Sequence, residues 1–203
     1  MKILIASSNS GKLRDFSGAA SLFKVEFELI PNFKQLPEAV EDGATFAENA
    51  RKKSEHYSQW VARELVLADD SGLEVEALGG APGVHSARYA GLETGLPGNS
   101  KDQDNNARLL RELAGVEDGR RGARFVSVIS VARDGREVAS FRGEAEGVLL
   151  RSPKGNNGFG YDPLFWYAPL GKTFAELTAE DKAAVSHRGN AIRKFLAWAK
   201  NQR

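Results

Sequence analysis

The feature that most limits the possible folds is a pair of apolar segments joined by a two-residue turn. Residues 123–141, ARFVSVISVARDGREVASF, carry β-branched and aromatic residues on both sides of Asp134 and Gly135. An Asp-Gly pair in that position is a strong β-hairpin signal, because both turn residues need a positive φ that Asp and Gly tolerate. We therefore predict two long strands here, and any sheet that contains them is at least partly antiparallel.

The remaining chain alternates between strand and helix periodicity. Strands are predicted at residues 2–6, 25–30 and 65–68, and helices at 13–23, at 45 to about 63, and in the final AIRKFLAWAK segment. The first thirty residues therefore resemble a strand-helix-strand unit. We predict a mixed α/β fold in a single domain of residues 1–203.

Composition excludes several classes of function. The chain has 203 residues, of which 41% are hydrophobic, so it can bury a substantial core. Its 28 basic and 27 acidic residues leave a net charge of +1, which favours neither nucleic acid nor a membrane surface. Cysteine is absent, which excludes disulfides and thiolate chemistry. No segment resembles a signal peptide or a membrane span, so we expect a cytoplasmic protein.

Two adjacent carboxylates follow the apolar run Leu65 to Ala68. Asp69 and Asp70 precede Ser71 and Gly72, a turn-forming pair, so we expect the strand to end at the carboxylates. Like charges in a partly desolvated site repel, and they usually need a cation or a shared proton. The alternative is a solvated turn.

The segment SSNSGK, residues 7–12, lies between the first predicted strand and helix. Backbone N–H groups at a helix start suit an anion, and Lys12 adds a positive charge. The segment is no Walker A loop, because that pattern needs residues other than Ala6 and Leu13 at its ends. It is either a phosphate-binding loop or a plain capped turn.

The segment TFAENARKKS, residues 45–54, has Thr45 and Glu48 at capping-box spacing, so helix initiation alone could explain Glu48. Lys53 falls on the apolar stripe of the same helix. A lysine on an inward face needs an anion nearby or must extend to solvent.

Two further segments carry polar and aromatic groups near the C-terminal end. FGYDP, residues 159–163, places two aromatic rings on a Gly-rich loop, where they could close the core or offer a stacking surface for a flat base. SHR, residues 186–188, follows Lys182 and supplies donors for an anionic or carbonyl ligand. A lone histidine is more often structural. Together, the motifs predict a nucleotide site with Mg²⁺.

Six motifs, in order and in register, resemble the inosine triphosphate pyrophosphatase family. They are SSNSGK, TFAENARKK, ADDSGL, GGAPGVHSARYAG, GNNGFGYDP and AELTAEDKAAVSHR. The resemblance extends from about Lys2 to Leu196. It implies an elongated mixed β-sheet flanked by helices, two lobes with a central active-site cleft, a homodimer and a required Mg²⁺. The implied reaction is hydrolysis of dITP, ITP or XTP, which are non-standard purine nucleoside triphosphates, to the nucleoside monophosphate and pyrophosphate.

The resemblance also implies roles for individual residues. Asp70 would be the general base and a metal ligand, with Glu41 and Asp69 as further metal carboxylates. Because Glu38 and Asp42 lie close to Glu41, either could take its place. The implied triphosphate-binding residues are Ser7, Ser8, Asn9, Ser10, Gly11, Lys12, Lys53 and Ser71. The implied base-binding residues are Phe159, Gly160, Tyr161, Asp162, Lys182, His187 and Arg188.

Two rival functions remain open. A pyrophosphatase of the Maf-like type would act on modified pyrimidine triphosphates, although the SHR and FGYDP segments resemble the purine family instead. A nucleotide sensor would keep the loops and lose the carboxylates, whereas Asp69 and Asp70 are both present. A nucleic-acid-binding module is disfavoured by the balanced charge.

Overall fold

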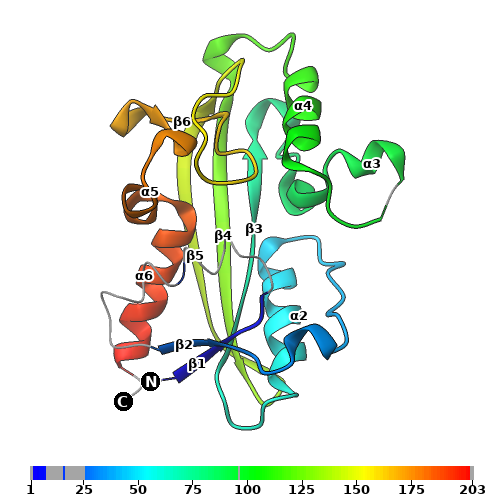
Figure 1. Ribbon diagram of the computed structural model, residues 1–203, viewed down its shortest axis with the longest axis vertical. Helices are drawn as coiled ribbons and strands as arrows, with labels where there is room; N and C mark the ends of the chain where they lie inside the picture. The colour runs from blue at the N-terminus through cyan, green and yellow to red at the C-terminus, as the bar shows by residue number, and fades with distance from the viewer. Residues whose placement is uncertain (1, 8–15, 17–25, 96, 202–203) are drawn as a thin grey trace. The chain divides into compact units, whose positions relative to one another are not determined.

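The computed structural model of the chain describes residues 2–7, 16, 26–95 and 97–201. These residues form both strands and helices (Figure 1). The strands are β1 (Lys2–Ile5), β2 (Glu26–Leu29), β3 (Val66–Val75), β4 (Gly122–Arg133), β5 (Arg136–Leu149), β6 (Phe165–Tyr167) and β7 (Lys172–Thr173). The α-helices are α2 (Phe46–Ser58), α3 (Gly91–Thr94), α4 (Asp102–Glu112), α5 (Ala179–Val185) and α6 (His187–Lys200).

Some predictions lie outside the described residues. These are the loop residues Ser8, Asn9, Ser10, Gly11 and Lys12, and the helix at 13–23 apart from Phe16. Their roles stay predictions. In the described part of the chain, no helix is both long enough and apolar enough to span a bilayer.

The seven strands form one mixed sheet in the order β2-β1-β3-β4-β5-β6-β7. β1 pairs in parallel with β2 and with β3, whereas β6 pairs antiparallel with β5 and with β7. The neighbouring strands β4 and β5 are joined by Asp134 and Gly135, whose φ angles are 49° and 80°. The predicted hairpin and the mixed α/β fold are confirmed.

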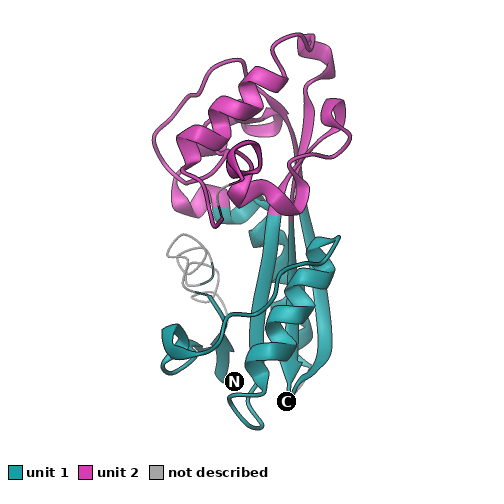
Figure 2. Cartoon of the chain, turned by 90° about the vertical axis from the view of Figure 1, so that its right-hand side faces the viewer, with its two compact units in different colours: residues 1–71, 127–144, 183–203 teal, residues 72–126, 145–182 magenta. Residues whose placement is uncertain are grey.

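The chain divides into two compact units, each with its own core (Figure 2). Unit 1 comprises Met1–Ser71, Ser127–Glu144 and Ala183–Arg203, and unit 2 comprises Gly72–Val126 and Ala145–Lys182. The core of unit 2 is rich in aromatic rings. The ring centroids of Phe125 and Phe165 lie 4.6 Å apart, and those of Phe165 and Phe174 lie 4.8 Å apart.

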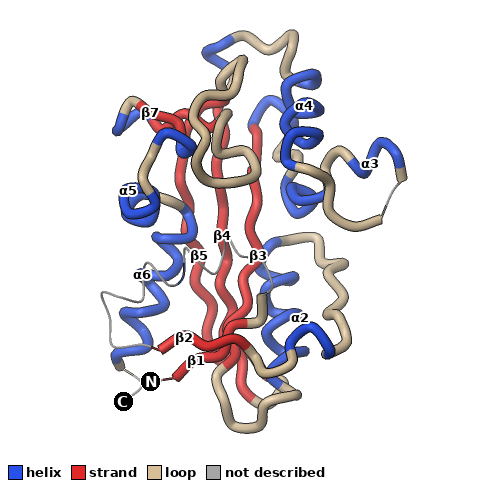
Figure 3. The backbone as a smooth tube through the Cα atoms, viewed as in Figure 1, coloured by secondary structure: helices blue, strands red, loops and turns tan. Residues whose placement is uncertain are grey.

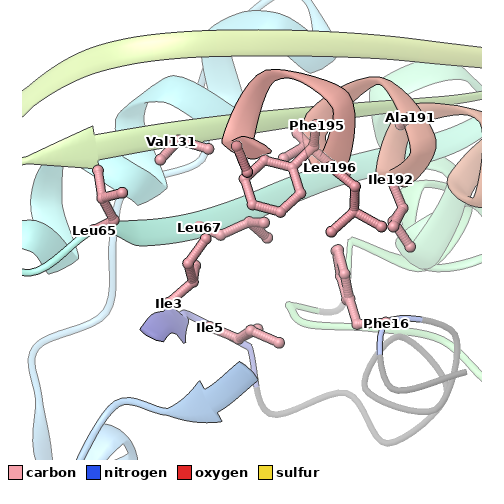
Figure 4. Packing of buried hydrophobic residues seen from close by; sticks show 12 residues of the cluster. Ile3, Ile5, Phe16, Leu65, Leu67, Val131, Ala191, Ile192, Phe195 and Leu196 are labelled. Atoms are coloured by element: carbon pink, nitrogen blue, oxygen red, sulfur yellow. The ribbon is translucent and has the colours of Figure 1, made fainter. Parts of the chain in front are cut away.

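In unit 1, helices cover both faces of the sheet (Figure 3). On one face, Ile3 and Leu67 pack against Phe195 of α6 (Figure 4). On the other face, Leu4 and Val66 lie in one cluster with Tyr57 of α2. Because successive side chains of a strand point to opposite faces, β1 and β3 contribute to both layers. This packing places α2 and α6, the helices that carry the candidate site residues, against the same strands.

β3 differs from the prediction that the strand ends at the two carboxylates. It runs without interruption from Val66 to Val75, so Asp69 and Asp70 lie in mid-strand, and the turn predicted at Ser71 and Gly72 is wrong. The two residues have turn-forming chemistry, but Leu73 and Val75 continue the buried pattern of the strand. Burial and pairing therefore override the local turn preference.

The end of α2 also differs from the prediction. The helix ends at Ser58, whereas the apolar stripe suggested an end near Arg63. Arg63 has a φ of 66°, which lies outside the helical region. Its backbone N–H donates to Asp134 Oδ1 of the β4–β5 turn at 2.8 Å. Val61 still packs on the core from beyond the helix, which explains why it appeared to continue the stripe.

Gly143 of β5 permits the close approach of α6. A Cβ atom there would lie 2.1 Å from the carbonyl oxygen of His187 and 2.3 Å from the backbone nitrogen of Ala191. We expect Gly143→Ala to lower the free energy of unfolding by about 2 kcal/mol, because backbone must move on both sides. Urea denaturation measures this effect. Gly115→Ala is the control, since a Cβ at Gly115 would meet nothing within 4 Å. Equal stability of the two variants would contradict this account of the packing.

Candidate active site

Lys53 lies between two carboxylates of unit 1. Its Nζ is 2.8 Å from Glu41 Oε2 and 3.2 Å from Asp70 Oδ1, and the residue is only 8% exposed. Burial alone would lower the pKa of Lys53, but the negative charges of Asp70 and Glu41 outweigh it and raise the pKa above its ordinary value. Lys53 is therefore charged at neutral pH. The prediction that Lys53 faces inward is confirmed, and of the two alternatives for such a lysine the structure shows the nearby anion.

Asn49 contacts the second carboxylate oxygen of Asp70, and it was not among the predicted site residues. Asn49 Nδ2 donates to Asp70 Oδ2 at 3.3 Å, and Asn49 Oδ1 accepts from the backbone N–H of Gly43 at 2.8 Å. Its position one turn before Lys53 on α2 was the signal that could have identified it. The two helix residues together fix both oxygens of the Asp70 carboxylate.

The start of α2 is set by its capping box. Thr45 Oγ1 accepts from the backbone N–H of Glu48, and Glu48 Oε2 accepts from the backbone N–H of Thr45, each at 3.2 Å. Helix initiation therefore accounts for Glu48, as the capping-box spacing of Thr45 and Glu48 indicated. The same cap fixes where the helix begins, and so which face carries Asn49 and Lys53.

Among the three acidic residues near position 41, Glu41 is the one that contacts Lys53. Asp42 instead pairs with Lys52. This geometry favours Glu41 over its neighbours as the partner of Asp70.

Asp69 lies with Arg188 and Ser71. Arg188 Nη2 donates to Ser71 Oγ at 2.8 Å, and Arg188 Nε lies 3.5 Å from Asp69 Oδ2. Ser71 Oγ also donates to Asp69 Oδ2 at 3.4 Å. The side chains of Asp69 and Arg188 are both 1% exposed, so this is a buried ion pair. The structure brings together Ser71 and Arg188, two of the predicted site residues. Their roles in binding and the metal role of Asp69 stay predictions.

The start of α6 presents His187 and Arg188. Ser186 is the N-cap, and its side chain accepts from the backbone N–H of Gly189 at 3.1 Å. His187 is 4% exposed, and Asn190 Nδ2 anchors the same turn to the carbonyl of Glu144 at 2.7 Å. The SHR segment therefore lies at the start of the last helix, which begins four residues before the AIRKFLAWAK segment in which it was predicted.

In unit 2, the loop Phe159–Asp162 meets Lys182 of α5. The Lys182 ammonium pairs with Asp162 and lies 4.8 Å from the centroid of the Phe159 ring. Tyr161 is 3% exposed and its hydroxyl donates to the carbonyl of Ser86 at 2.8 Å. Burial raises the pKa of Tyr161. Tyr161 thus closes the core, whereas Phe159 is half-buried.

The carboxylates of unit 1 fit a hard cation whose coordination shell is completed by water and by phosphate oxygens. The described residues contain no group of three or more His, Cys, Asp or Glu side chains that could hold a metal. Two carboxylates, Glu41 and Asp70, converge on Lys53 instead. Mg²⁺ in nucleotide sites is typically held by one or two carboxylates, with water and substrate phosphates completing its shell.

The fold and these side chains together define an α/β protein with a carboxylate–lysine cluster, and comparison with known proteins identifies the family. The model of the Ham1 family matches residues 3–198. A dITP/XTP pyrophosphatase of Acidobacterium capsulatum is 51% identical over 199 residues, which cover 97% of either chain. A dITP/XTP pyrophosphatase of Syntrophobacter fumaroxidans is 51% identical over 94% of this chain and 78% of the relative.

Solved structures agree with the sequence comparisons. The Ham1 protein of Staphylococcus aureus has 39% identity and a TM-score of 0.85, with full coverage of both chains. A nucleoside-triphosphatase / dITP/XTP pyrophosphatase of Mycobacterium abscessus has 39% identity and a TM-score of 0.69, over 96% of this chain and 97% of that one. The chain belongs to the Ham1 family, and the resemblance drawn from its six motifs is confirmed.

Proposed function

We propose that the chain is a pyrophosphatase for non-standard purine nucleoside triphosphates, which converts dITP, ITP or XTP and water to the nucleoside monophosphate and pyrophosphate. The observation that carries the proposal is the Asp70 carboxylate, which Lys53 and Asn49 orient from both sides. The relatives named dITP/XTP pyrophosphatase support the substrate class.

In this proposal, Asp70 accepts the proton of the attacking water. An oriented carboxylate can hold that water in line with the phosphorus atom and take its proton as the new P–O bond forms. Lys53 is charged and lies 3.2 Å from Asp70, so its ammonium would also donate to a phosphate oxygen of a substrate bound beside Asp70. The loop of Ser7 to Lys12 and Ser71 would hold the rest of the triphosphate.

Glu41 and Asp70, with Asp69 as the further predicted ligand, would hold Mg²⁺. When bound, the ion would neutralise phosphate charge and act as a Lewis acid. The chain's own contribution is to keep Glu41 and Asp70 together before the metal arrives. Lys53 does so by offsetting the repulsion between the two carboxylates.

The base would be recognised by the aromatic loop and by donors of the SHR segment. The ring of the half-buried Phe159 would offer a stacking surface, supported by Gly160, Tyr161, Asp162 and Lys182. Hypoxanthine and xanthine carry a carbonyl at C6, which His187 or Arg188 would satisfy as donors. Adenine presents an amino group there, so protein donors would remain unpaired, and such a mismatch discriminates strongly.

The wider proposal is a single catalytic domain of residues 1–203 that acts in the cytoplasm as a homodimer. It needs neither nucleic acid nor a membrane as a partner. The balanced composition, with a net charge of +1, supports that part of the proposal.

Incubation with ITP and Mg²⁺ tests the reaction. We expect IMP and pyrophosphate in equal amounts, resolved by anion-exchange chromatography. We expect EDTA to lower the rate by at least about 100-fold and added Mg²⁺ to restore it, because phosphate charge would otherwise be unscreened at the reacting centre. Release of IDP and inorganic phosphate would contradict the proposed bond cleavage, and full activity in EDTA would contradict the metal role.

A further inference from the structure

Two side chains of α4 hold both backbone polar groups of Gly160, in the middle of the aromatic loop. The N–H of Gly160 donates to Asp102 Oδ2 at 2.6 Å, and Asn106 Nδ2 donates to the carbonyl of Gly160 at 2.9 Å. Asp102 and Asn106 are four residues apart, so they lie on the same face of the helix. All three residues belong to unit 2.

The loop has an unusual backbone that needs such support. Gly160 has a φ of 62°, a left-handed conformation that residues with a side chain rarely adopt. The neighbouring N–H of Phe159 donates to Asp162 Oδ2 at 2.8 Å, and Asp162 in turn pairs with Lys182. The peptide groups on the two sides of Phe159 are therefore fixed by Asp162 of the loop itself and by Asp102 of α4.

Packing of α4 does not require these two contacts. Leu109 and Leu113 anchor the helix in the core, each with 0% exposure. Asn105 adds two hydrogen bonds to the segment before α3, since its Oδ1 accepts from the N–H of Ala90 at 2.8 Å and its Nδ2 donates to the carbonyl of Ala87 at 3.3 Å. Asn106 Oδ1 is buried with no hydrogen-bond partner, so the Asn106 contact leaves a polar atom unsatisfied. Asp102 and Asn106 thus act on the loop rather than on the core.

We infer that Asp102 and Asn106 are positioning residues that fix the Phe159 ring for stacking against the purine base. The inference rests on the proposed function, because it assigns Phe159 the role of the stacking surface. A loop held at Gly160 presents the ring in one orientation. If these contacts are lost, the ring can adopt several orientations. Substrate binding must then order the loop, and the entropy lost in this step weakens the affinity.

Matched variants of α4 test this inference. Asp102→Ala removes the acceptor for Gly160, whereas Asp104→Ala removes an exposed acid from the same first turn without touching the loop. Asp102→Asn keeps an oxygen acceptor and is the rescue variant. Asn106→Ala removes the donor, and Gln103→Ala is its exposed amide control. Each protein is assayed with ITP, and its binding of pyrophosphate, which has no base, is measured separately.

We expect Asp102→Ala and Asn106→Ala each to raise KM for ITP roughly fivefold, as loss of one hydrogen bond allows, with a smaller change in kcat. Pyrophosphate affinity should stay at the wild-type value, because the phosphate end is untouched. The Asp104→Ala, Gln103→Ala and Asp102→Asn variants should behave as wild type. An equal KM in Asp102→Ala and Asp104→Ala would overturn the inference, as would a parallel loss of pyrophosphate binding.

Hydrogen exchange separates this inference from the proposed function. Amide exchange in residues 155–165 should become faster in Asp102→Ala and Asn106→Ala than in their controls, whether or not ITP is a substrate. If the wild-type protein fails to hydrolyse ITP, the proposed function is wrong, while faster exchange still supports the contact of α4 with the loop. Unchanged exchange in both variants would overturn the positioning role even in an active enzyme.

Discussion

Asp70→Asn is expected to lower kcat for ITP by about a thousandfold, the scale of a positioned general base. The amide keeps the shape of the carboxylate but cannot accept the proton of water. Nucleotide binding should change far less, because Lys53 keeps its charge and its contact with Glu41. Steady-state kinetics, together with calorimetric binding of ITP, measure the two effects separately.

Asp42→Asn is the matched control for this variant. Asp42 is an exposed carboxylate beside Glu41, and it pairs with Lys52 rather than with Lys53. We expect its kcat to equal that of the wild type. A near-normal kcat in well-folded Asp70→Asn would remove Asp70 from the mechanism, and an equal loss in both variants would point to a general effect of charge.

Arg188→Met is expected to cause the largest loss of stability among these variants, about 4 kcal/mol in the free energy of unfolding. The substitution leaves the Asp69 carboxylate, which is 1% exposed, without the guanidinium that faces it. It also removes the donor to Ser71. The pair is buried, so solvent cannot replace the lost partner. Denaturant unfolding, followed by circular dichroism, gives the value.

Two further variants test whether the buried ion pair is the cause of that loss of stability. Arg193→Met removes an exposed arginine from the same helix, and we expect it to cost at most about 1 kcal/mol, because solvent replaces its bonds to the carbonyls of Ala183 and Ala184. Asp69→Asn combined with Arg188→Met should recover part of the stability, since no buried charge then remains unpaired. No recovery in the double variant would show that the charge pair is not the cause.

Local patterns in the sequence predicted the parts of the fold that short-range chemistry determines. The Asp134-Gly135 turn specifies the hairpin by its own backbone preference. Lys53 was predicted to face inward because apolar residues surround it at helical spacing. The structure confirms both predictions.

The parts that depend on tertiary contacts could not be predicted. Ser71 and Gly72 have turn chemistry, and only pairing with neighbouring strands keeps β3 extended through them. Because the strand continues, alternation separates the two carboxylates, and Asp69 meets Arg188 while Asp70 meets Lys53. Asn49 was missed because its role depends on a residue 21 positions away in the chain.

The most direct test of the central claim is a side-by-side measurement of kcat/KM for pyrophosphate release from ITP, dITP, XTP, GTP, ATP and dUTP. The account predicts that the three non-standard purine substrates exceed ATP and dUTP by at least about 100-fold, because donors that face C6 favour a purine carbonyl there. Guanine carries the same carbonyl, so the slow GTP hydrolysis that we also expect requires discrimination at C2 instead. Release confined to dUTP would place the protein with the pyrimidine-specific enzymes. Equal rates for ITP and ATP would contradict the proposed recognition of the base.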